Sequence, residues 1–217
     1  MDIPANLLPD SSLWIAAAVY VALLVTAGLT APWDKLLDKE GSNIYFGAVA
    51  FIAVVWILRA GIEPGHNYHL LGATALCLMF GWQFALIAVS LVLVITTWQG
   101  PAGWETFAIN ALVMGAVPVL FTGIMLYACQ RWLTHNFFIY VFINAFLTGA
   151  LSMLLCGFAA SAVLSMANDM PTGSYLQVIP LLMFGEAFLN GMLMILLVAY
   201  KPGWVATFHD HWYLDGK

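Results

Sequence analysis

Six long apolar stretches constrain the fold of this chain more than any other feature. They cover roughly residues 13–30, 44–62, 70–98, 105–130, 136–166 and 176–200. Each is long enough to cross about 30 Å of hydrocarbon at about 1.5 Å per helical residue. Strand-like alternation is absent, so a β-barrel is not expected. With only 8% charged residues and a mean hydropathy of +0.93, the chain is predicted to be an all-α polytopic membrane protein.

The stretch 70–98 can be read as one long helix or as two helices broken near Gly81. Two helices would place five basic residues on one side of the membrane: Lys35, Lys39, Arg131, Lys201 and Lys217. One helix would instead move Arg131 and Lys201 to the opposite side. Because basic residues are enriched in cytoplasmic loops, the charges favour the hairpin. We therefore predict about seven transmembrane helices, with the N-terminus outside and the C-terminus in the cytoplasm.

The first arm of this hairpin, roughly residues 70–81, is predicted to be a short helix surrounded by protein. It would be only about 18 Å long, which is less than the hydrocarbon thickness, so it needs shelter from other helices. Broken helices beside polar loops are a recurring way to build ligand sites in transporters. Residues 1–203 are expected to form a single multi-pass helical domain in the inner (plasma) membrane, followed by a short cytoplasmic tail at 204–217.

A polar loop, residues 63–72, precedes the short helix and holds two of the five histidines, His66 and His69. Polar side chains near the hydrocarbon are costly, so their position points to function. Imidazole is also a common ligand of transition metals. The loop is therefore the first candidate for a binding site, although two hydrogen-bonded interfacial histidines would give the same pattern.

Further polar residues lie within or beside the apolar stretches. Glu186, with Asn190 one turn further on, is either a functional carboxyl group or a hydrogen-bonded group that locks the bundle. Asn110 is expected to be a buried polar residue that fixes helix packing or the loop. His209 and His211, in the tail, are weaker candidates for metal binding on the cytoplasmic side.

Other classes of function lack their sequence signatures. The net charge of −5 provides no basic surface, so nucleic acid is not expected as a partner. No Gly-x-x-x-x-Gly-Lys-Ser/Thr loop occurs, so ATP hydrolysis would have to come from other subunits. His-Glu-x-x-His and Gly-x-Ser-x-Gly are also absent from the sequence, so an enzyme is not expected. No covalently bound cofactor is predicted.

Four short motifs follow one another along the chain: Met1-Asp2-Ile3-Pro4, His69-Leu70-Leu71-Gly72, Asn110 with Met114, and Gly185-Glu186-Ala187. In this order they resemble the Met-His-Ile-Pro, Gly-His-Leu-Leu-Gly, Ala-Asn-x-x-Asn-Met and Gly-Glu-Gly/Ala motifs of the CbiM/NikM group. These proteins are the substrate-binding membrane subunits of energy-coupling-factor transporters for cobalt and nickel. The resemblance covers roughly residues 1–203.

The resemblance implies a mechanism of metal uptake. The N-terminal segment would tuck into the helical bundle, where the α-amine of Met1, the second residue and the loop histidine would ligate a divalent metal. Nitrogen-rich, near-planar coordination suits Ni(II), and Co(II) is also accepted. Two ATPase chains and a coupling membrane subunit would energise uptake from the outer face. The lipid bilayer is the remaining expected partner.

This chain departs from the family motifs at two positions. Asp2 stands where the family has histidine, and Val113 stands where it has a second asparagine. His66 could supply the missing imidazole, which gives the candidate ligand set Met1, Asp2, His66 and His69. Mixed nitrogen and oxygen ligands suit Zn(II) or Co(II) at least as well as Ni(II). The alternative function is a non-pumping accessory subunit that stabilises a larger membrane complex or supplies it with metal.

Overall fold

The structure is a computed structural model that describes residues 3–4, 7–63, 66–100, 103–166 and 173–213. The side chains of residues 60–63, 66, 173–176 and 210–211 are outside this description. Within the described part, six helical segments are long and apolar enough to cross a membrane. The chain is thus a multi-pass, all-α membrane protein, as the apolar stretches predict.

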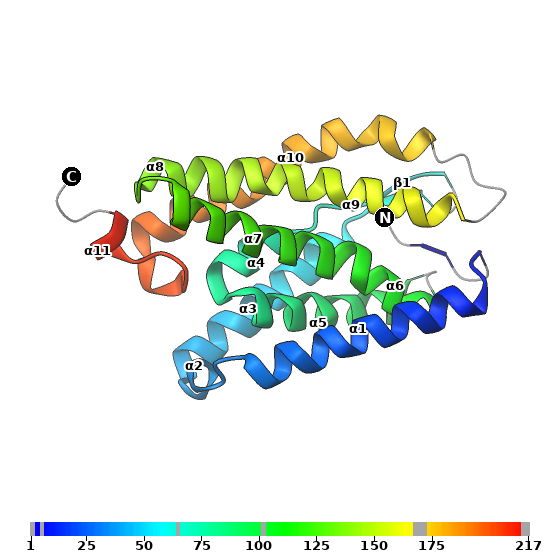
Figure 1. Ribbon diagram of the computed structural model, residues 1–217, viewed down its shortest axis with the longest axis horizontal. Helices are drawn as coiled ribbons and strands as arrows, with labels where there is room; N and C mark the ends of the chain where they lie inside the picture. Colours follow the sequence, from blue (N-terminus) through cyan, green and yellow to red (C-terminus); the bar gives the residue numbers. More distant parts are fainter. Residues whose placement is uncertain (1–2, 5–6, 64–65, 101–102, 167–172, 214–217) are drawn as a thin grey trace.

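The six segments lie side by side, with their ends gathered at two opposite faces of the molecule (Figure 1). Three are single helices: α1 (Asp10–Thr30), α3 (Lys39–Ile57) and α5 (Trp82–Gln99). A fourth lies within α10 (Gly173–Tyr200). The other two segments are each built from consecutive helical elements and contain a π-helical stretch. The first consists of η1 (Trp104–Thr106, a 3-10 turn), α6 (Phe107–Ala111), the π-helical η2 (Leu112–Ala116) and α7 (Val117–Trp132). The second consists of α8 (Phe137–Ile139), the π-helical η3 (Tyr140–Leu147) and α9 (Thr148–Leu164).

A seventh helix, α4 (Ala73–Phe80), is too short to cross a membrane and forms the predicted hairpin with α5. The break is at Gly81, whose φ of 86° and ψ of 163° lie in a region open essentially only to glycine. The residues from Ala73 to Met79 are all buried. Both parts of the prediction, a broken hairpin and a sheltered first arm, are therefore confirmed.

The C-terminal end of α4 is closed by the segment that follows α10. A helix end inside a bundle leaves carbonyl groups without helical partners. The backbone N–H of Ala206 donates to the Met79 carbonyl at 2.8 Å, and the Thr207 hydroxyl donates to the Leu78 carbonyl at 2.7 Å. After η4 (Pro202–Trp204) the chain therefore packs back against the bundle, and its described part ends in α11 (Asp210–Tyr213). The proposed domain boundary at residue 203 stays a prediction.

The second apolar stretch, predicted to run to residue 62, ends as a helix at Ile57. It is followed by a small antiparallel hairpin of β1 (Ala60–Glu63) and β2 (His66–Tyr68). The predicted extension of the helix to residue 62 is therefore wrong. In sequence, Pro64 and Gly65 are turn-forming residues between the two strands, and strand pairing satisfies backbone groups that a helix would otherwise satisfy.

Basic residues gather at one end of the bundle, as the hairpin requires. The short helix α2 (Asp34–Leu37) contains Lys35, and Lys39 begins α3. Arg131 is in the last turn of α7, and Lys201 follows α10. Figure 1 shows α2 and α11 at this end and β1 at the other. We call the former the α2 end and the latter the β1 end.

Replacing Gly81 with alanine is expected to lower the free energy of unfolding by about 1–3 kcal/mol, because a Cβ is not tolerated at this φ and ψ. Denaturant titration in detergent micelles measures the effect. Gly28→Ala in α1 is the matched control, since an added Cβ there meets no atom within 4 Å. This control should be unchanged or slightly stabilised. Equal stability of the two variants would contradict the role assigned to Gly81.

Candidate functional site

His69 lies in the segment that joins β2 to α4, and it is buried. Only 4% of its surface is exposed. Its Nδ1 is 3.2 Å from the carbonyl oxygen of Leu70. If Nδ1 carries the proton and donates to this carbonyl, the lone pair is on Nε2. Metal-binding histidines usually have this arrangement, in which the second ring nitrogen donates to a backbone oxygen and so fixes the tautomer.

Trp56, in the last turn of α3, holds this segment from one side. Its ring centroid is 4.4 Å from that of His69, and the two planes are inclined by 38°. Its indole N–H donates to the carbonyl of Leu71 at 3.0 Å. The sequence alone does not single out Trp56, because a tryptophan near the end of an apolar stretch normally belongs to the interfacial belt. Its 2% exposure separates it from such residues.

Glu186, on α10, holds the same segment from the opposite side and is fully buried. Its two carboxyl oxygens accept the backbone N–H groups of Leu71 and Gly72, each at 2.7 Å. Asn190, one turn along α10, accepts the N–H of Ala75 at 2.7 Å and donates to Glu186 at 2.9 Å. These donors form the N-terminal end of α4, where helical N–H groups lack partners and acceptors are favoured.

Gly72 explains why the His-Leu-Leu-Gly motif ends in glycine. Its φ of 64° is in the left-handed region, and a Cβ at this position would collide with Ile52 of α3. The turn brings the chain from His69 into α4 while Leu71 and Gly72 face Glu186. The motif is therefore a compact turn whose backbone groups are used by side chains of two helices.

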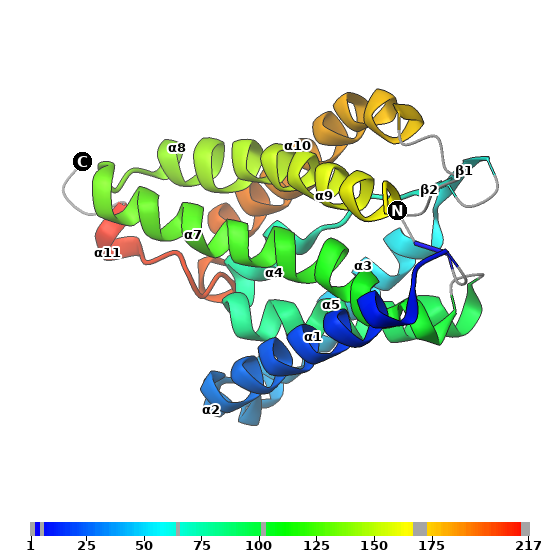
Figure 2. The same ribbon diagram turned by 45° about the vertical axis from the view of Figure 1, so that its right-hand side comes forward.

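Asn110, on α6, holds the start of the chain. Its side-chain oxygen accepts the backbone N–H of Ile3 at 2.8 Å, and its side-chain N–H donates to the Ile3 carbonyl at 3.2 Å. Ile3 is fully buried. Figure 2 shows the described start of the chain, in dark blue, at the β1 end, and the two hydrogen bonds to Asn110 join it to α6. At Ile3 the N-terminal segment thus enters the bundle, as the resemblance implies.

Replacing Asn110 with leucine is expected to release Ile3 from the bundle, because the Ile3 peptide would lose both partners at a cost of about 1–3 kcal/mol. The measurement is maleimide labelling of an Ile3→Cys protein in which the three native cysteines are replaced. Labelling should become about tenfold faster in Asn110→Leu. Asn43→Leu, at an exposed position, is the control. An unchanged labelling rate in Asn110→Leu would contradict this assignment.

Not all of the predicted ligands can be placed. Met1 and Asp2 lie outside the described residues, and His66 contributes its backbone to β2 while its side chain is outside the description. Among the residues that are described, no group of three or more His, Cys, Asp or Glu side chains could hold a metal. The four-residue ligand set therefore stays a prediction, with His69 as its described member.

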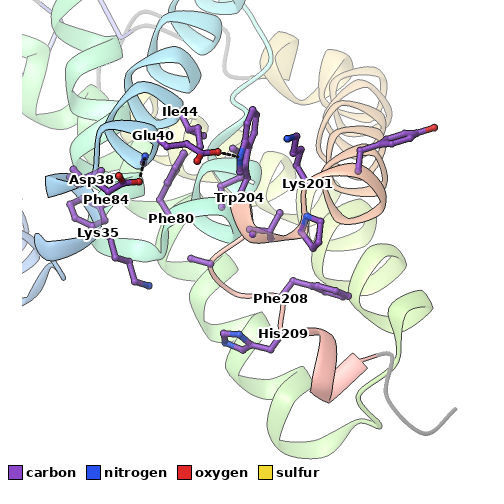
Figure 3. Close-up of a pocket in the computed structure, with 18 residues that line it drawn as sticks. Lys35, Asp38, Glu40, Ile44, Phe80, Phe84, Lys201, Trp204, Phe208 and His209 are labelled. Atoms are coloured by element: carbon purple, nitrogen blue, oxygen red, sulfur yellow. Dashed lines mark hydrogen bonds between the residues drawn. The ribbon is translucent and has the colours of Figure 1, made fainter.

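His209 lies far along the bundle from His69, at the α2 end. It lines a cavity of about 790 Å³, together with Lys35, Glu40, Phe80 and Trp204 (Figure 3). The indole N–H of Trp204 donates to Glu40 at 3.2 Å and ties the segment after α10 to α3. The side chain of His211 is outside the description. Metal binding by these two histidines stays a prediction.

Comparisons with known proteins agree with the fold and with the four motifs. A family model described as "CbiM: Cobalt uptake substrate-specific transmembrane region" matches residues 2–204. A crystal structure described as a transition metal transporter superposes with a TM-score of 0.76 at 19% identity, over 92% of this chain and 93% of the other. A second, described as a truncated transition metal transporter, gives 0.67 at 20% identity, over 92% and 99%. No curated protein sequence matches the chain significantly.

The two structural likenesses show the fold, and the family match shows the relationship and confirms the resemblance read from the motifs. Members of this family are subunits of transport systems and not enzymes. Because the match spans nearly the whole sequence, the chain belongs to the CbiM family of cobalt uptake substrate-specific transmembrane proteins.

Proposed function

We propose that this chain binds a divalent transition-metal ion at the outer membrane face for uptake, and that partner ATPase subunits energise its transport. The observation that carries the proposal is the fixed orientation of His69. Its ring is buried against Trp56, and its Nδ1 lies 3.2 Å from the Leu70 carbonyl, the arrangement found in metal-binding histidines whose Nε2 is the ligand nitrogen.

A second feature supports a metal site at the β1 end. Asn110 binds both backbone groups of Ile3, so the third residue of the chain is held inside the bundle. Asp2 is bonded directly to Ile3. We propose that the α-amine of Met1 and the carboxylate of Asp2 complete the site with His66 and His69. Such a mixed nitrogen and oxygen set suits Co(II) and Zn(II) at least as well as Ni(II).

The electrostatics of α4 also suit a bound cation. The N-terminal end of a helix carries a partial positive charge, which would disfavour a metal beside His69. Glu186 lies at this end, and the three groups that face its carboxyl oxygens, from Leu71, Gly72 and Asn190, are all donors. An ionised carboxylate accepts from donors in this way. A carboxylate at this position would offset the helix charge and favour a cation nearby.

The distribution of basic residues supports an orientation with the β1 end outside. The α2 end carries Lys35, Lys39, Arg131 and Lys201, and basic residues are enriched on the cytoplasmic side. In the inner (plasma) membrane, the site would thus face outward. The cavity at the α2 end (Figure 3) would face the cytoplasm, where we propose that a coupling membrane subunit and two ATPase chains dock.

The test is metal binding by the purified full chain with its native, untagged N-terminus. Elemental analysis and equilibrium titration with Co(II), Ni(II) and Zn(II) should show one site per chain. The companion variant Asp2→His restores the imidazole found at this position in the family, and it should shift the preference toward Ni(II). Absence of stoichiometric binding of all three ions would overturn the proposal and favour the accessory-subunit alternative.

A further inference from the structure

We infer that Trp56 is a positioning residue of the metal site, and that it sets the affinity of His69 for the ion through direct ring contact. The inference rests on the proposed function, because it concerns the same site. Trp56 touches the His69 segment at two places that are two residues apart. Its ring lies 4.4 Å from the imidazole, and its N–H donates to the carbonyl of Leu71.

These two contacts make Trp56 part of a clamp on Leu71. The Leu71 carbonyl accepts from Trp56 of α3, and the Leu71 N–H donates to Glu186 of α10 at 2.7 Å. Both backbone groups of this residue are thus bound by side chains from different helices. Because His69 is only two residues away, the clamp fixes the backbone from which the imidazole projects.

The ring contact should grow stronger when a metal binds. A divalent ion on Nε2 withdraws electron density from the imidazole, which becomes cation-like. The face of an indole is electron-rich and attracts cationic groups more than any other aromatic side chain does. If the contact between the two rings is stronger in the metal-bound state, the difference in contact free energy adds to the free energy of metal binding and raises the affinity. A purely structural tryptophan would stabilise both states equally and would leave the affinity unchanged.

The location of Trp56 separates it from the tryptophans that anchor the protein at the membrane surface. Trp98 and Trp132 are 81% and 77% exposed, whereas Trp56 is 2% exposed. A buried tryptophan needs a partner for its N–H. Here that partner is the loop of the candidate site and not the helix bundle, so the indole is coupled to the loop conformation.

The experiment compares Trp56→Phe and Trp56→Leu with Trp98→Phe and Trp98→Leu in the full chain. Co(II), Ni(II) and Zn(II) are titrated into each purified protein. Loss of a group that orients a metal ligand typically costs about 10–100-fold in metal affinity, and we expect this for Trp56→Leu. Trp56→Phe keeps an aromatic face but loses the bond to Leu71, so it should recover most of the affinity. Both Trp98 variants should bind like the wild type.

Tryptophan fluorescence provides a second readout, which reports the distance between Trp56 and the bound metal. Co(II) or Ni(II) held by His69 would lie close to the Trp56 indole and should quench its emission in a saturable way. The quenching should be absent in Trp56→Phe and present in Trp98→Phe. If neither Trp56 variant folds, the wild type decides: stoichiometric metal binding without saturable quenching would overturn the inference and leave the metal site standing.

The outcomes distinguish the inference from the function on which it depends. If Trp56→Leu binds metal as tightly as the wild type while His69→Ala does not bind, the role of Trp56 is refuted and the metal site stands. If the wild type binds no metal, or if His69→Ala binds as tightly as the wild type, the proposed site itself is refuted. Parallel losses in the Trp98 variants would also refute a specific role for Trp56.

Discussion

Replacing His69 with alanine is expected to lower the affinity for Co(II), Ni(II) and Zn(II) by more than about 100-fold. Loss of a group that merely orients a ligand already costs about 10–100-fold, and loss of the ligand itself should cost more. The His69 imidazole also contacts both the Trp56 ring and the Leu70 carbonyl, which hold it in place. The measurement is competitive titration against a metal chelator of known affinity.

The control for this prediction is His209→Ala. His209 lies at the α2 end of the bundle, near the cavity of Figure 3, and should not contribute to a site at the β1 end. Its replacement should leave the affinity within about twofold of the wild type, which is less than about 0.5 kcal/mol. A loss of binding in His209→Ala but not in His69→Ala would move the metal site to the opposite end of the molecule.

Replacing Glu186 with glutamine is expected to lower the free energy of unfolding by about 2–4 kcal/mol. The carboxyl oxygens accept three hydrogen bonds, from Leu71, Gly72 and Asn190, in a fully buried environment. Glutamine keeps only one oxygen, so its NH2 group must face at least one buried donor. An unsatisfied buried donor costs about 1–3 kcal/mol, and the loss of one of the two acceptor oxygens adds to this. Denaturant titration in micelles measures the loss.

Glu105→Gln is the matched control for the Glu186 variant, because it makes the same chemical change on an exposed side chain of η1. It should change the free energy of unfolding by less than about 0.5 kcal/mol. Glu186→Gln should also weaken metal binding, since the turn from His69 to Gly72 loses its fixed backbone partner. Wild-type stability of Glu186→Gln would show that the hydrogen bonds of the carboxyl group do not stabilise the N-terminal end of α4.

The helical segments could be predicted because their signal is local. A span of about 20 apolar residues is required by the thickness of the bilayer, and each stretch carries that signal by itself. The break at Gly81 was also predictable, since the basic residues could gather at one end only if the stretch 70–98 contained a turn. The end of the second stretch was not, because β1 and β2 satisfy each other's backbone groups and thereby replace the last helical turn.

The sequence by itself determined the membrane class, the hairpin with its sheltered arm, and His69, Asn110 and Glu186 as residues of interest. Only the tertiary structure decided what these residues do. Asn110 reaches Ile3 across 107 positions, and Glu186 reaches Leu71 across 115. Trp56 belongs to the site because α3 packs against the loop before α4, and this packing is visible only in the tertiary structure. Hydropathy and charge act on each segment separately, whereas hydrogen-bond partners depend on which helices pack together, which no single segment encodes.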